Sequence, residues 1–96
     1  MLFVGLWEYD AEDFEKVSEK FTQQATERKK WPQKYPKLVF GPYGFNGERK
    51  GFTVYETDDP DQLANVSIFY APEMEWKFVP LIDSRKSLEL WAKMKK

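Results

Sequence analysis

The sequence contains neither cysteine nor histidine. Without cysteine it has no disulfide, no thiol nucleophile and no cysteine-ligated metal. Without histidine it lacks the commonest general base and the commonest metal ligand. Oxygen ligands for a metal cluster at Glu56, Asp58, Asp59 and Asp61, but their spacing matches no metal-binding loop motif. We expect no metal and no cofactor. Whether the chain is an enzyme stays open, since catalysis would have to use residues such as Tyr43, Arg49, Tyr55 or Glu56.

The net charge is also small, and the apolar runs are short. The formal net charge is −1 at pH 7, so no overall field attracts nucleic acid or an anionic membrane. No apolar run approaches the roughly 20 residues that a membrane-spanning helix needs. The opening MLFVGLWEYD lacks the basic leader of a signal peptide. These features predict a cytoplasmic protein with no membrane partner.

The most informative segment that is present runs from Leu38 to Leu63. Asn46-Gly47 separates two runs rich in apolar and aromatic residues. This predicts a β-hairpin with a type I′ turn, which needs positive φ at both central residues. Asp59-Pro60 predicts the start of a helix, with Asp59 as N-cap and Gln62 completing a capping box.

The remaining elements follow from periodicity and from breaker residues. Strands are expected over 2–7, 38–45, 48–57 and 75–82, and helices over about 10–31, 60–69 and from 84 onward. Asp10 and Ser84 are the expected caps of the first and last helices. The first helix has an apolar stripe, and the last has apolar residues at helical spacing: Phe14, Val17, Phe21 and Ala25; Leu88, Trp91 and Met94.

The order β-α-β-β-α-β over 96 residues predicts one α+β domain, residues 1–96, with a ferredoxin-like four-stranded antiparallel sheet. Right-handed crossovers place both main helices on one sheet face. Pro42 and Pro80 mark the second and fourth strands as edges. The other face is then bare and has to be covered by a second copy, a ligand or stacked bases.

Three segments resemble a small uncharacterised prokaryotic family, a domain of unknown function within the dimeric α/β-barrel superfamily. They are MLFVGLW, GERKGFTVYETDDPDQL and EWKFVPLIDSRKSLEL. The resemblance implies that two ferredoxin-like subunits pack sheet against sheet. Some relatives in the superfamily are cofactor-free monooxygenases or isomerases, and several of these use a histidine. The resemblance transfers no catalytic residue to this chain, which has no histidine.

An RNA-recognition motif has the same order of elements and is a further alternative. Phe3 on the first strand and Lys50-Gly51-Phe52 on the third occupy positions where that motif has base-stacking aromatics. The next stacking position is Val54, and the net charge lacks a basic footprint. Nucleic acid is therefore not the expected partner.

The sequence-based hypothesis is a homodimer joined through the helix-free sheet faces, possessing a pocket for a small, largely apolar molecule beside the sheet. The candidate ligand-binding or interface residues are Phe3, Trp7, Tyr43, Phe52, Tyr55 and Trp76. A cofactor-independent monooxygenase- or isomerase-like enzyme is the first alternative. A single-stranded RNA-binding module is the second.

Overall fold

A computed structural model describes residues 1–95. Its main elements follow the predicted order, with two short 3-10 turns at Ala11–Asp13 and Pro32–Lys34. They are β1 (Leu2–Tyr9), α1 (Phe14–Lys30), β2 (Lys37–Gly44), β3 (Lys50–Glu56), α2 (Pro60–Tyr70), β4 (Met74–Leu81) and α3 (Ser84–Met94).

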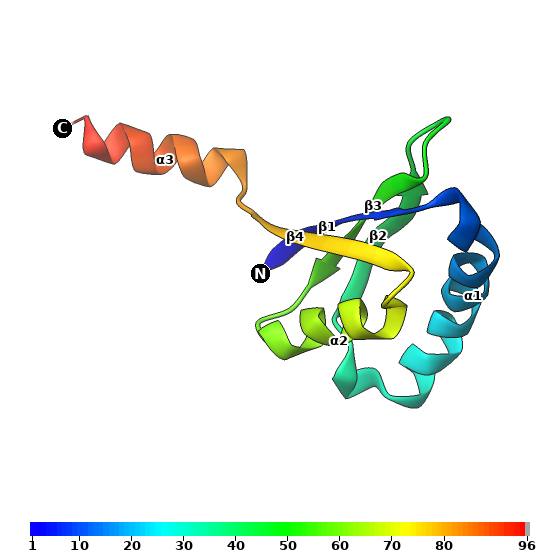
Figure 1. Ribbon diagram of the computed structural model, residues 1–96. Coiled ribbons are helices and arrows are strands. Elements are labelled where there is room, and N and C mark those ends of the chain that lie inside the picture. The colour runs from blue at the N-terminus through cyan, green and yellow to red at the C-terminus, as the bar shows by residue number, and fades with distance from the viewer. Residues whose placement is uncertain (96) are drawn as a thin grey trace.

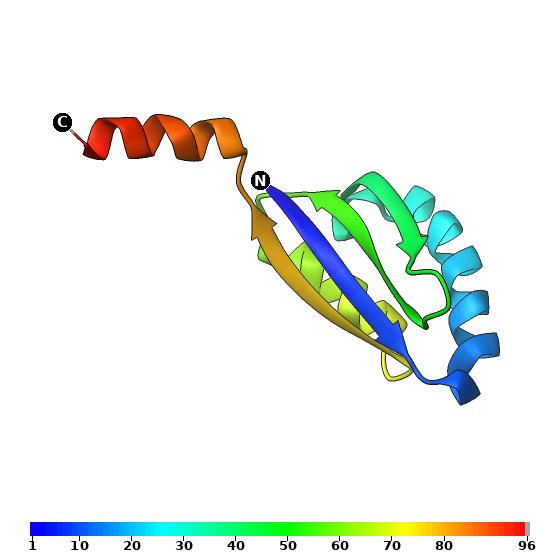
Figure 2. The same cartoon turned by 90° about the horizontal axis from the view of Figure 1, so that it is seen from above.

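The four strands form one antiparallel sheet in the order β2-β3-β1-β4. Helices α1 and α2 cover one face of this sheet, and the opposite face carries no helix (Figures 1 and 2). This is the ferredoxin-like arrangement, so the predicted fold is confirmed. Pro42 and Pro80 lie on the edge strands β2 and β4, as expected from their missing N–H groups.

The hydrophobic core lies between the helices and the covered sheet face. The sheet contributes Trp7, Tyr55 and Met74, and the helices contribute Val17, Leu63, Val66 and Tyr70. Two glycines make room for the large rings. A Cβ on Gly51 would lie 2.5 Å from the Trp7 ring, and one on Gly5 would lie 2.8 Å from the Trp76 ring. Each indole therefore lies over a backbone position without a side chain.

The start of α2 agrees with the sequence except in one contact. The Asp59 carboxylate accepts a hydrogen bond from the Asp61 N–H at 2.9 Å, and Pro60 is the first helical residue. The predicted capping-box contact of Gln62 is wrong. The Thr57 hydroxyl accepts from the Asp59 N–H instead, and the Gln62 amide donates to the Gln33 carbonyl at 3.0 Å.

The β2–β3 hairpin has a different turn from the predicted one. Of the two central turn residues, Asn46 and Gly47, only Gly47 has positive φ (+79°), and the Glu48 N–H donates to the Phe45 carbonyl at 3.0 Å. Positive φ at the second central residue alone is the pattern of a type II turn. The strands end at Gly44 and resume at Lys50, so five residues rather than two connect them. The longer loop removes the requirement for a type I′ turn.

Both other predicted caps differ in the structure. The Asp10 side chain makes no capping hydrogen bond, because a 3-10 turn intervenes before α1 begins at Phe14. Asp83, rather than Ser84, caps α3 by accepting from the Arg85 N–H at 2.8 Å. Phe14 and Ala25 are exposed, so the predicted stripe of α1 covers the sheet only through Val17 and Phe21.

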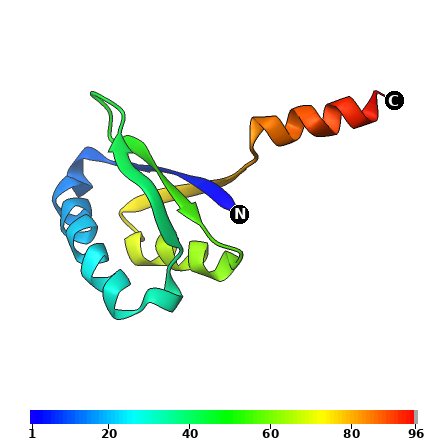
Figure 3. The ribbon, with the colours of Figure 1, turned by 180° about the vertical axis from the view of Figure 1, so that it is seen from behind.

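Helix α3 projects beyond the end of β4, clear of the sheet and of the other helices (Figures 1 and 3). The projection gives the molecule extents of 55 × 33 × 18 Å. Across residues 1–95, no helix has the length and apolar character needed to cross a membrane.

Candidate functional site

Strand register divides the six sequence-predicted site residues between the two sheet faces. On β1, Phe3 pairs with Tyr55 and Trp7 pairs with Trp76, so these four residues share the helix-covered face. On the other side, Tyr43 pairs with Phe52 on the helix-free face. The expected grouping of Phe3 and Trp7 with Phe52 in one surface is therefore wrong.

The same register separates the aromatic pair on which the RNA-binding alternative depended. Leu6, not Phe3, shares a face with Phe52, since Leu6 and Phe52 are direct partners. Phe3 packs against the core beneath the helices. An RNA-recognition motif needs its stacking aromatics side by side on the open face. This chain therefore lacks the Phe3–Phe52 platform that its sequence suggested.

A cavity of about 140 Å³ lies on the helix-covered side, between α1 and the sheet. We call it the α1 cavity. Its lining residues come from both helices and from β2 and β3: Phe21, Gln24, Arg28, Leu38, Pro42, Thr53, Tyr55 and Tyr70. Phe21, Leu38 and Pro42 supply apolar walls, whereas the other five side chains carry polar groups. This mixture of apolar walls and a few inward polar groups is typical of small-molecule sites.

Gln24 is the unusual member of the α1 cavity. Its side chain is only 4% exposed, and neither its amide nitrogen nor its carbonyl oxygen has a hydrogen-bond partner within the described chain. Leaving a buried polar group unpaired costs about 1–3 kcal/mol. A bound molecule that both donates and accepts a hydrogen bond would remove that cost.

The two tyrosines of the α1 cavity are neutral hydroxyls at physiological pH. Burial raises the pKa of Tyr55 to about 12, and the nearby Arg28 charge opposes part of this rise. Burial also raises the pKa of Tyr70, with the neighbouring Tyr55 adding to the effect. Thr53 lies beside Tyr55, and its hydroxyl accepts a hydrogen bond from the Trp7 indole N–H at 3.2 Å. Both phenols are therefore available as neutral hydrogen-bond groups.

The helix-free face, which we call the open face, is largely apolar. Alternation and register assign to it Leu2, Val4, Leu6, Phe40, Tyr43, Phe52, Val54, Val79 and Leu81. Phe40 and Tyr43 are 51% and 54% exposed, and their ring centroids lie 4.8 Å apart. Phe45, from the hairpin loop, stacks on Phe52 at 6.0 Å. Contiguous exposed apolar patches are uncommon on monomeric proteins, and larger ones often belong to interaction sites.

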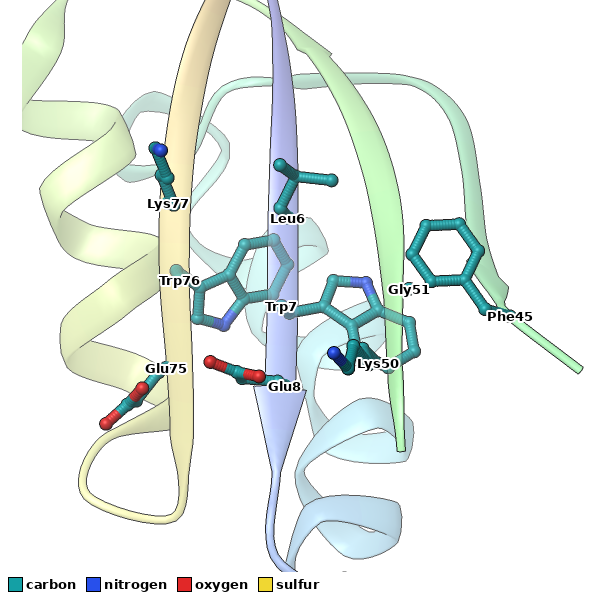
Figure 4. A pocket seen from close by; sticks show the side chains of 9 residues that line it. All are labelled: Leu6, Trp7, Glu8, Phe45, Lys50, Gly51, Glu75, Trp76 and Lys77. Carbon is teal, nitrogen blue, oxygen red and sulfur yellow. The ribbon is translucent and has the colours of Figure 1, made fainter. Parts of the chain in front are cut away.

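A second, wider hollow of about 450 Å³ lies on the open face near the end of the sheet where β4 begins (Figure 4). We call it the sheet-end hollow. Leu6 and Phe45 give it apolar walls, and Glu8, Lys50, Glu75 and Lys77 surround them. Beyond it lie the exposed or half-exposed carboxylates of Asp10, Glu12 and Asp13, within 4.8 Å of one another. Exposed acidic groups of this kind give the sheet end a negative charge.

Sequence reasoning missed Gln24, Arg28 and Tyr70. A signal was present, because Val17, Phe21, Gln24 and Arg28 continue one helical stripe at spacings of four, three and four. The apolar reading of α1 followed the stripe to Ala25, whereas the structure turns Gln24 toward the sheet.

Comparison with known proteins places nearly the whole chain in one uncharacterised family. A family model described as a domain of unknown function, DUF3303, matches residues 1–95. This agrees with the sequence resemblance to a small family of that kind. No curated protein matches the chain. Membership of the dimeric α/β-barrel superfamily stays a prediction.

Proposed function

The chain belongs to the domain of unknown function family DUF3303. Because this family carries no assigned function, we infer the function from the structure and propose a homodimeric small-molecule-binding protein. The α1 cavity is the proposed ligand site. The observation that carries this proposal is the buried Gln24 amide, whose two polar atoms are both unpartnered. The cytoplasmic location remains a prediction.

The chemistry of the ligand follows from the groups around Gln24. Its amide offers one acceptor and two donors, so a ligand amide would match it in both directions. Phe21 and Leu38 favour an apolar body, and Tyr55 adds a neutral hydroxyl. The volume of about 140 Å³ is close to the roughly 150 Å³ of an apolar cavity that binds benzene. A single ring with a polar substituent is therefore the expected size.

Benzamide is a suitable probe, with toluene as the ring lacking the amide. We expect benzamide to raise the melting temperature of the protein and to perturb NMR signals of α1 and β3. At ten times its dissociation constant, it would add about 1.4 kcal/mol, or roughly 6 to 11 °C for a domain of this size. Toluene would produce a smaller shift, because it leaves Gln24 unpaired.

Gln24→Leu and Gln23→Leu form a matched pair on α1, because Gln24 is buried and Gln23 is exposed. Gln24→Leu should abolish the benzamide shift and stabilise the free protein, whereas Gln23→Leu should behave as wild type. Equal benzamide shifts in both variants would refute the role of Gln24. No shift in wild-type protein would indicate that water alone fills the α1 cavity, and the proposal would fail.

The homodimer rests on the open face. Its exposed aromatic cluster of Phe40, Tyr43, Phe45 and Phe52 would leave solvent if a second copy packed against it. Sheets pack face to face about 10 Å apart, with their inner side chains interdigitated. Light scattering over a wide dilution series should give the mass of a dimer. A monomer at every concentration would refute this part of the proposal.

A cofactor-independent enzyme is the second candidate, favoured by the perturbed tyrosines of the α1 cavity. Tyr55, Tyr70 and Arg28 bring two neutral hydroxyls and a cation to one site, where they could stabilise a developing oxyanion. No carboxylate is among the residues that line the cavity. A proton abstraction would therefore need a base from the substrate or from water. Turnover of a bound ligand, lost in Tyr55→Phe, would favour this candidate over simple binding.

A further inference from the structure

Helix α3 has an apolar side with nothing packed on it. Leu88, Trp91 and Met94 recur at spacings of three, and they are 66%, 59% and 84% exposed. The helix has 11 residues, whereas isolated helices shorter than about 12–15 residues are marginal in water. Figures 1 and 3 show it lying clear of the rest of the chain. Helix α3 therefore needs a surface that its own subunit does not supply.

The link to β4 directs α3 outward. Only Ile82 and Asp83 join the strand to the helix, and Asp83 has the extended conformation of an N-cap. The Asp83 carboxylate also accepts from the Arg85 guanidinium at 2.9 Å. Exposed Leu81 and Ile82 continue the apolar surface of α3 to the edge of the open face. An apolar arm thus begins where the proposed dimer interface ends.

The area needed by a stable dimer favours a second copy as the occupant. Four strands about 4.8 Å apart, each of seven or eight residues with a rise of about 3.3 Å per residue, span an open face of roughly 450–500 Å² in flat projection. A standard interface buries about 800 Å² of accessible surface on each partner. The open face alone is small by this standard, and an added helix from each subunit would enlarge the interface.

We propose that α3 is an exchanged arm, which packs on the partner subunit and places Trp91 in the partner's sheet-end hollow. This inference rests on the proposed dimer. A two-fold axis perpendicular to the strands would bring the end of β4 in one subunit over the beginning of β4 in its partner. The sheet-end hollow lies at that beginning, and Leu6 and Phe45 offer apolar walls for an indole.

Charge complementarity supports the same placement. Helix α3 with its two caps carries four basic residues, Arg85, Lys86, Lys93 and Lys95, against the two acids Asp83 and Glu89. The rim of the sheet-end hollow is balanced, with Glu8 and Glu75 against Lys50 and Lys77, and the carboxylates of Asp10, Glu12 and Asp13 beyond it make this end of the sheet net negative. A basic helix is thereby attracted to the acidic end of the partner sheet. The apolar side would enter the hollow while the lysines face the acids.

The dimer dissociation constant tests the arm. The double variant Leu88→Gln/Trp91→Gln introduces two glutamines on the apolar side of α3. The control variant Glu89→Gln/Lys93→Gln introduces two glutamines on the opposite side of the same helix. We expect the first to weaken the dimer by on the order of 100-fold or more, because two buried tryptophan anchors are lost per dimer. The control variant should change the dimer dissociation constant less than tenfold. A wild-type dimer with equal constants for both variants would overturn the arm while leaving the dimer intact.

Cross-linking locates the arm, because the natural chain has no cysteine to interfere. Under mild oxidation, Leu6→Cys/Trp91→Cys should give a covalent dimer, whereas Leu6→Cys/Glu89→Cys should not. A disulfide within one chain would mean that α3 folds back on its own sheet, which would overturn the exchange. A wild-type monomer in light scattering would refute the proposed dimer and the arm together.

Discussion

Alanine at Gly51 should destabilise the protein strongly, while alanine at its cross-strand partner Gly44 should not. The two glycines face each other in the β2–β3 register. A Cβ on Gly51 would overlap the Tyr43 carbonyl oxygen and lie 2.5 and 2.6 Å from two carbons of the Trp7 ring. A Cβ on Gly44 would meet only ordinary contacts, the nearest at 3.8 Å.

The expected magnitudes follow from these distances. The Tyr43 carbonyl belongs to the backbone of the hairpin and the Trp7 ring is buried, so neither can move cheaply. Forcing one extra carbon into such a site costs about 1–3 kcal/mol. At Gly44, reduced freedom of the unfolded chain would instead add up to about 0.5–1 kcal/mol of stability. The two variants should therefore differ by about 1.5–4 kcal/mol.

Thermal unfolding followed by circular dichroism provides the assay. One kcal/mol shifts the melting temperature by roughly 4–8 °C in a domain of this size, so Gly51→Ala should melt well below Gly44→Ala. Both variants must be compared at one protein concentration, because a dimer's melting temperature depends on it. Equal melting temperatures would show that Trp7 does not lie over Gly51, and the assignment of β1 side chains to the two faces would be wrong.

Two further predictions concern the buried phenol and the helix caps. Burial raises the pKa of Tyr55 to about 12 from 10.0, so the unfolded chain ionises first and stability is lost as pH rises from about 10 to 12. The loss in the free energy of unfolding, about 2–3 kcal/mol, should be smaller in Tyr55→Phe than in the wild type. If the melting temperatures of both proteins fell equally between about pH 10 and 12, the prediction would be wrong. Asp59→Ala should cost about 1 kcal/mol by removing the α2 cap. Asp83→Ala should leave the melting temperature of the dilute monomer nearly unchanged, because α3 projects from the core; a loss equal to that of Asp59→Ala would refute this.

The order of the elements was predictable because each boundary has a local cause. Asp59-Pro60 starts α2 through a side-chain cap and a preset φ, and the structure confirms both. Pro42 and Pro80 marked the edge strands because proline cannot donate to a ladder. Such signals depend only on residues that are neighbours in the sequence, so they can be recognised without knowledge of the tertiary structure.

The two faces of β1 were not predictable from alternation, because both its even and its odd positions are apolar from Leu2 to Trp7. In the structure, Gly5 and Gly51 leave space on the helix-covered face for the indole rings of Trp76 and Trp7, because a Cβ at either glycine would overlap a ring. Charged residues at the end of the other face, such as Glu8 and Lys50, were the available signal. That signal needed the strand register, which depends on contacts distant in sequence.

The α1 cavity was missed for a related reason. A glutamine on a helix is ordinarily solvated. The stripe of Val17 and Phe21 indicates that Gln24 turns inward, but it does not indicate that Gln24 lines a cavity with Tyr55. Its position emerges only when α1 packs on the sheet with Val17 and Phe21 inward. The helical stripe then carries Gln24 inside, although its amide finds no partner there. The apolar neighbours hold the Gln24 amide inward, where a ligand could form hydrogen bonds with it.

The charges of the open face favour self-association over RNA binding. Phe40, Tyr43 and Phe52 remain available for stacking, and aromatic platforms do bind single strands where a basic groove follows the backbone. However, the charged residues assigned to this face are three acids and three lysines, a net charge of zero: Glu8, Glu56 and Glu75; Lys37, Lys50 and Lys77. Phosphates would meet no net positive field, whereas an apolar interface needs none. Association through this face should therefore persist in 1 M salt, and its loss on adding salt would contradict the apolar interface.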